Sequence, residues 1–221
     1  MSRRDSPFLP CSSFLISGAT GSGKTQWVYR FLKNMGQMFP PGQKPKAVLY
    51  CYGIYQTLFD DMTNDIPNIR FHEGLPSQKT LEHLAETGKN SLLILDDLMS
   101  EVSGNAATEK LFTRGTHHLQ ISVIYIVQNL LYQNKHARTI SLNTQYMILF
   151  RNIRDASQIS YLARQMHPRR PAVLMDAYED ATSTPFGYLV IDMHPQSADE
   201  RQRLNTGIFP REERTYYQPA L

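Results

Sequence analysis

The most informative segment of the chain reads Gly18-Ala19-Thr20-Gly21-Ser22-Gly23-Lys24-Thr25, and it comes directly after the apolar residues Phe14-Leu15-Ile16-Ser17. It fits the pattern GxxxxGK[ST], in which glycines let a loop curl so that its backbone N–H groups point at phosphate oxygens. Lys24 would reach the β- and γ-phosphates, and the Thr25 hydroxyl would bind Mg²⁺. We therefore interpret all eight residues as the binding site of a nucleoside triphosphate.

Two carboxylates end a second apolar segment, Ser91-Leu92-Leu93-Ile94-Leu95-Asp96-Asp97. In proteins with a phosphate loop, the acidic end of such a strand holds Mg²⁺ and prepares the attacking water. We assign Asp96 to the metal, together with Thr25, and Asp97 to the water, with Glu101 as the alternative to Asp97. The phosphate loop is expected to face Asp96 across adjoining strand ends.

A polar amide, Gln128, ends the next predicted strand. Open α/β sheets bind their ligands at the carboxyl ends of the strands. Gln128 is therefore predicted to sense the γ-phosphate or to orient the attacking water, and we group it with Lys24 and Asp97 as catalytic.

Apolar and amphipathic segments alternate along the chain. Strands are predicted at residues 13–17, 47–52, 68–71, 91–95, 121–128, 145–150 and 188–193, and helices at 24–35, 78–87 and 155–166. Several of the strands are continuously apolar, which is typical of strands buried on both faces. The pattern predicts an α/β fold, a mostly parallel central sheet with helices on both faces.

Composition favours one globular domain over residues 1–221, with flexible tails at 1–9 and 212–221. The chain is 41% hydrophobic and carries a net charge of only +3. No apolar run approaches the roughly 20 residues that cross a bilayer, and no apolar segment follows the basic amino terminus. The two cysteines, Cys11 and Cys51, have no CxxC spacing. We therefore expect no membrane association, no secretion and a reducing compartment.

These motifs together resemble those of the FtsK–HerA superfamily of P-loop motors. More narrowly, they are similar to the genome-packaging ATPases of eukaryotic double-stranded DNA viruses and of Maverick/Polinton (adintovirus-like) elements. The resemblance covers roughly residues 8 to 210. Besides the phosphate loop and the acidic strand end, it rests on the run from Arg114-Gly115-Thr116-His117-His118 through Ile126-Val127-Gln128-Asn129.

The resemblance implies a RecA/FtsK–HerA-like fold and a homo-oligomeric ring, pentameric or hexameric, that uses ATP and Mg²⁺ to drive double-stranded DNA into a capsid. Capsid or portal proteins would be its partners, and the host nucleus, viral factory or virion its location. In such rings an arginine of one subunit enters the site of its neighbour. Arg114 matches a recurring arginine of the superfamily, and Arg151 and Arg154 are the alternatives.

The basic character of the middle of the chain agrees with a polyanionic partner. Residues 111–170 carry eight lysines and arginines against one acid, Asp155. Within this block, Lys135 and Arg138 follow the strand that ends at Gln128. We expect them to contact DNA phosphates without reading sequence.

Other functional classes fit the sequence less well. A P-loop kinase acting on a nucleoside or other small molecule, with Arg164, Arg169 and Arg170 as a lid, would not need the Arg114 and Gln128 arrangement. A GTPase is disfavoured because Asn134-Lys135-His136-Ala137 lacks the Asp of the NKxD motif. A non-catalytic relic is disfavoured because the set of catalytic residues is complete.

Overall fold

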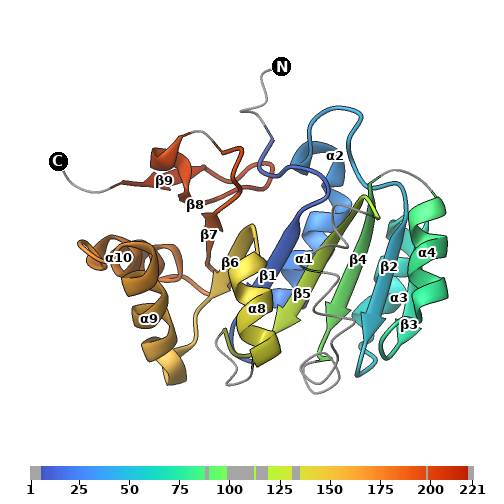
Figure 1. The fold of residues 1–221 in the computed structure, drawn as a ribbon, viewed down its shortest axis with the longest axis horizontal. Helices are drawn as coiled ribbons and strands as arrows, with labels where there is room; N and C mark the ends of the chain where they lie inside the picture. Colours follow the sequence, from blue (N-terminus) through green and yellow to red (C-terminus); the bar gives the residue numbers. More distant parts are fainter. Residues whose placement is uncertain are drawn as a thin grey trace.

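The computed structural model describes residues 6–87, 90–98, 112, 119–130, 135–197 and 199–218. In this part of the chain, nine strands form one sheet in the order β3-β2-β4-β5-β1-β6-β7-β8-β9 (Figure 1). The strands from β3 to β6 are parallel, whereas β7, β8 and β9 are antiparallel. The strand bounds are β1 Ser13–Ser17, β2 Val48–Tyr52, β3 Ile69–Glu73, β4 Ser91–Asp96, β5 Ile121–Val127, β6 Tyr146–Phe150, β7 Tyr188–Asp192, β8 Leu204–Thr206 and β9 Thr215–Tyr217.

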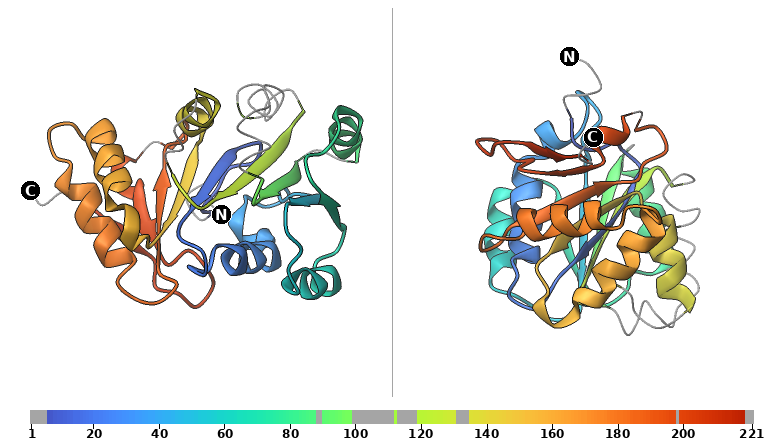
Figure 2. Two further views of the ribbon diagram at one scale, coloured as in Figure 1. Left: turned by 90° about the horizontal axis from the view of Figure 1, so that it is seen from below. Right: turned by 90° about the vertical axis from the view of Figure 1, so that its left-hand side faces the viewer.

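Helices cover both faces of this sheet, as predicted (Figure 2). Side chains alternate along each strand, so that Phe14 and Ile16 of β1 face one layer and Leu15 faces the other. One layer consists of α1 Lys24–Lys33, α2 Met35–Met38 and α3 Leu58–Asp65. Among the described helices, the other layer contains α4 Gln78–Glu86, α8 Lys135–Asn143, α9 Ala156–Met166 and α10 Ala172–Ala181.

All seven predicted strands are present, and their ends differ from the predicted ends by at most two residues. The central strands β1, β4, β5 and β6 are buried along their whole length, which explains their continuously apolar sequences. The predicted helix at 24–35 ends earlier, at Lys33, because Asn34 leaves the helical conformation with a φ of −109°. None of the helices that the structure describes has the length and hydropathy of a bilayer-spanning segment.

Within the two predicted tails, Phe8 and Glu212 pack against the folded domain. Phe8 is only 1% exposed, and its ring lies 5.1 Å from the ring of Phe14 and 4.9 Å from that of Tyr146. Near the other end, the Glu212 carboxylate accepts hydrogen bonds from Tyr188 and Arg30 at 2.7 Å each. Short tail segments carry too weak a periodicity to reveal such anchors.

Replacement of the buried ring near the amino terminus tests this anchoring. Phe8→Ala should lower the free energy of unfolding by about 3–5 kcal/mol, because it removes a large buried aromatic side chain. Leu142→Ala is the matched control, since Leu142 is 66% exposed and its loss should change stability by less than about 0.5 kcal/mol. Urea unfolding of both variants measures the difference, and equal stability of the two would contradict the anchoring.

Candidate nucleotide-binding site

Three parallel strands carry the predicted site residues to one edge of the sheet. Ser17 of β1 pairs with Val127 of β5, and Asp96 of β4 pairs with Ile126. The phosphate loop, Gln128 and Asp97 therefore leave the sheet at nearly the same level. The expectation that the loop and Asp96 occupy adjoining strands is wrong, because β5 lies between β1 and β4. This order places Gln128 between the loop and the carboxylates.

The phosphate loop has the backbone that its glycines predict. Gly21 and Gly23 have φ values of 77° and 100°, in the left-handed region that favours glycine. The Lys24 ammonium donates hydrogen bonds to the carbonyl oxygens of Gly18 at 2.6 Å and Ala19 at 2.9 Å. A Cβ atom at Gly18 would lie 2.6 Å from Cβ of Phe150, so the loop begins in close contact with β6. The cationic head of Lys24 is thus held at the loop.

Two further features of the loop suit an anion. Helix α1 begins at Lys24, and its free backbone N–H groups and dipole face the loop. The Ser22 hydroxyl is buried and has no hydrogen-bond partner among the residues that the structure describes. A buried hydroxyl without a partner is costly, and a phosphate oxygen would satisfy it. The residues present therefore fit the triphosphate that the sequence predicts.

The lysine and the two carboxylates are close enough to interact electrostatically. Burial lowers the pKa of Lys24, and the negative charges of Asp96 and Asp97 oppose this shift. All three groups therefore belong to one site.

Asp96 is a buried carboxylate held by a buried tyrosine. Asp96 is 5% exposed, and Tyr50, which is 0% exposed, donates a hydrogen bond of 2.7 Å to its Oδ2. Burial raises the pKa of Asp96 to about 6, against the lowering effects of the Tyr50 hydrogen bond and the Lys24 charge. Tyr50 fixes the orientation of the carboxylate. Sequence reasoning missed Tyr50, although a tyrosine inside an apolar strand signals a hydroxyl that needs a partner.

Asp97 and Gln128, predicted separately, are in contact. The Gln128 side-chain amide donates to Oδ1 of Asp97 at 3.3 Å, and both side chains are exposed. Asp97 has a φ of 54°, which turns the chain sharply after β4. This turn packs against Gly53, where a Cβ atom would lie 2.5 Å from the Asp97 carbonyl oxygen. Gly53 is therefore a residue of the site that the sequence alone did not identify.

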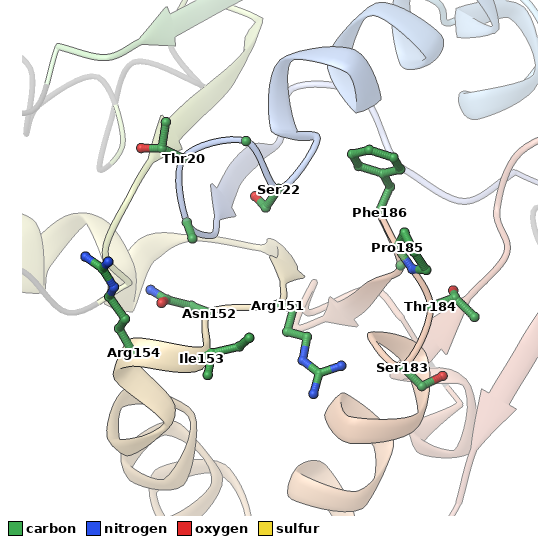
Figure 3. Close-up of a pocket in the computed structure, with 13 residues that line it drawn as sticks. Thr20, Ser22, Arg151, Asn152, Ile153, Arg154, Ser183, Thr184, Pro185 and Phe186 are labelled. Carbon is green, nitrogen blue, oxygen red and sulfur yellow. The ribbon is translucent and has the colours of Figure 1, made fainter.

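A cleft of about 510 Å³ lies beside the phosphate loop (Figure 3). The phosphate loop forms one wall of the cleft. The segment that follows β6 and the turn that precedes β7 form the other walls. Arg151 and Arg154, the predicted alternatives for an inter-subunit arginine, thus lie beside the phosphate loop of their own chain. The cleft is lined by Ala19, Thr20, Gly21, Ser22, Arg151, Asn152, Ile153, Arg154, Ser183, Thr184, Pro185, Phe186 and Gly187.

Several predicted residues are not placed by the structure. Arg114 and Glu101 lie outside the described residues, and of Lys135 only the position in helix α8 is described. Arg138 lies on the same helix and is exposed. The assignments of Arg114, Glu101 and Lys135 stay predictions.

No protein-family model and no curated protein matches the chain. Similar solved structures include B204, the DNA-packaging ATPase from Sulfolobus turreted icosahedral virus, with a TM-score of 0.60 and 11% identity over 96% of this chain and 99% of that one. The genome packaging NTPase B204 from Sulfolobus turreted icosahedral virus 2, in complex with ATP-gammaS, gives a TM-score of 0.56 and 11% identity over 96% and 99%. At this identity the likeness establishes the fold, and the predicted P-loop NTPase fold is confirmed.

The burial of Asp96 predicts a pH-dependent gain in stability for Asp96→Asn in the absence of Mg²⁺ and nucleotide. The pKa of Asp96 is raised to about 6 in the folded chain, against an ordinary value near 4. Between these values the folded chain keeps a proton that the unfolded chain has lost, so wild-type stability falls as pH rises. Above pH 6 the variant should therefore be more stable by up to about 3 kcal/mol.

Urea unfolding at several pH values between 4 and 7, with a chelator present, measures this gain. The gain should shrink steadily from pH 7 to pH 4, because Asp96 becomes protonated first in the folded and then in the unfolded state. Asp97→Asn is the matched control, because the Asp97 side chain is exposed. A stability difference that stays constant over this range would show that charge burial is not its cause.

Proposed function

We propose that the chain is an Mg²⁺-dependent ATPase that couples ATP hydrolysis to the movement of double-stranded DNA into a viral capsid, as a subunit of a homo-oligomeric ring. The observation that supports this most strongly is the convergence of Lys24, Asp96, Asp97 and Gln128 at the ends of three adjacent strands. The likeness to solved genome-packaging NTPases over nearly the full chain supports the packaging role.

Binding of ATP would use the backbone N–H groups of the phosphate loop and the Lys24 ammonium. Asp96 and Thr25 would hold Mg²⁺, which supplies positive charge to the β- and γ-phosphates when bound. Tyr50 occupies Oδ2 of Asp96. The other carboxylate oxygen is then available to the metal or its water ligands.

Hydrolysis would depend on the pair formed by Asp97 and Gln128. The Asp97 carboxylate accepts the Gln128 hydrogen bond through Oδ1. Its second oxygen can accept a hydrogen bond from the attacking water. The hydrogen bond from the Gln128 side-chain amide holds the carboxylate in place. Lys24 stabilises the charge that builds up on the phosphoryl oxygens.

Coupling to DNA would use basic residues that contact phosphates rather than bases. Arg138 is exposed on α8, and Lys135 precedes it by one helical turn in sequence. Arg114 would enter the site of the neighbouring subunit. Capsid or portal proteins would anchor the ring, and DNA packaging would take place in the host nucleus or a viral factory.

ATP hydrolysis should rise more than in proportion to protein concentration and should increase further with double-stranded DNA, because a ring completes each site. Lys24→Ala should abolish hydrolysis, and Arg138→Ala should keep the DNA-free rate while reducing the stimulation by DNA. Phosphate release measured against concentration, with and without DNA, tests all three. Turnover that requires an added nucleoside acceptor would instead indicate a kinase.

Mixed subunits test whether Arg114 acts between chains. Lys24→Ala and Arg114→Ala proteins should each be inactive alone, and mixing them should restore part of the activity, since one mixed interface joins an intact loop to an intact arginine. ATPase rates over a range of mixing ratios measure the rescue. Failure of every mixture to recover activity would assign the inter-subunit role to another residue.

A further inference from the structure

The cleft beside the phosphate loop has an unusual apolar rim. Among the described residues, the two most exposed large hydrophobic side chains are Ile153, at 82%, and Phe186, at 69%. Both line this one cleft. Exposed apolar side chains scattered over a surface need no explanation, but two on the rim of one cavity point to a ligand with apolar faces.

Phe186 is held in its exposed position by the backbone around it. Its φ of 61° lies in the left-handed region, which a bulky residue adopts only where the surrounding structure imposes it. The turn is closed by a hydrogen bond of 3.0 Å from the Gly187 N–H to the Thr184 carbonyl oxygen. At Gly187 an added Cβ atom would collide with the Ala181 carbonyl oxygen. The tight turn therefore fixes the backbone position of Phe186, although its side chain gains little burial.

The ring of Phe186 lies directly against the phosphate loop. A Cβ atom at Gly23 would be 2.9 Å from Cδ1 of Phe186, and the side chain lies toward the beginning of helix α1 (Figure 3). Gly23 is the residue that leads from the loop into that helix. An aromatic ring thus lies within one residue of the lysine that the proposed function assigns to the phosphates.

We infer that Phe186 is the stacking platform for the base of the bound nucleotide, and that the cleft between the loop, residues 151–154 and residues 183–187 receives the nucleoside. This inference rests on the proposed binding of a triphosphate at the loop. A volume of about 510 Å³ lies within the range of small-molecule sites. A base attached to phosphates held by the loop extends past Gly23 into this space.

The chemistry of the platform sets the selectivity. Stacking contacts the π-face of a base rather than its hydrogen-bonding edge, so it tolerates different bases and strengthens with ring area. ATP and GTP should therefore bind more tightly than CTP and UTP. The purine preference depends on the aromatic ring at position 186.

Calorimetric titration of the full chain with ATP, CTP and inorganic tripolyphosphate tests this role. Phe186→Ala should weaken ATP binding between about fivefold and about 150-fold, in keeping with the loss of one stacked base. It should leave tripolyphosphate affinity unchanged and reduce the ratio of ATP to CTP affinity. Phe186→Trp should retain ATP binding, and Leu142→Ala, which removes a similarly exposed side chain elsewhere, should change nothing.

Four results would overturn the inference. Unchanged ATP affinity in Phe186→Ala would remove the ring from the site, and an altered oligomeric state of that variant would assign it to an interface between copies. Equal loss of ATP and tripolyphosphate binding would show that the ring of Phe186 stabilises the phosphate loop rather than contacting the base. If the wild type binds neither ATP nor tripolyphosphate, the proposed function fails as well, which separates that failure from the failure of the platform alone.

Discussion

The parallel pairing of β1, β5 and β4 is the constraint on which the site depends. In a parallel ladder the register of each strand fixes the level at which its neighbour ends. The pairings of Ser17 with Val127 and of Asp96 with Ile126 bring the phosphate loop, the amide and the carboxylates to one level. A shift of one residue in β4 would turn Asp96 to the opposite face of the sheet and separate it from Tyr50. The buried apolar faces of these strands therefore hold the polar end groups in place.

The same packing creates an electrostatic cost. A carboxylate as buried as Asp96 is unfavourable when charged, and Tyr50 and Lys24 offset the cost only in part, since the pKa still rises to about 6. The pKa of Lys24 shifts in the opposite direction, because burial lowers it while the negative charges of the two carboxylates oppose the change. The site thus holds charges that are incompletely balanced within the chain. Under the proposed function, a triphosphate with its metal would bring both signs of charge to this site, and the stability lost in the free protein would then contribute to the free energy of nucleotide binding.

Residues recognisable from sequence are those whose chemistry or periodicity is local. The phosphate loop, the acidic end of β4 and the apolar strands could be predicted because each carries its own pattern. The roles of Tyr50, Gly53 and Phe186 could not be predicted, because they arise from contacts with distant segments of the chain. The contacting residues are more than 40 positions away for Tyr50 and Gly53, and more than 160 for Phe186. The strand order was missed for a related reason. Sequence gives the succession of strands but not the insertion of β5 between β1 and β4, which depends on how the connections cross the sheet.

The strand order also divides the site into two flanks. β5 and β4 lie on one side of β1 and carry Gln128, Asp97 and Asp96, whereas β6 and β7 lie on the other side and lead to the cleft. Under the proposed function, hydrolysis would use the first flank, and the nucleoside would bind at the second. Arg151 and Arg154 line the cleft on this second flank, beside the phosphate loop of their own chain. Arg114 instead lies in the connection between β4 and β5, in sequence the segment that joins the two hydrolytic strands. An inter-subunit arginine acts in the site of the neighbouring chain, so its position beside its own site does not select among the three, and the assignment of Arg114 stays a prediction from the sequence.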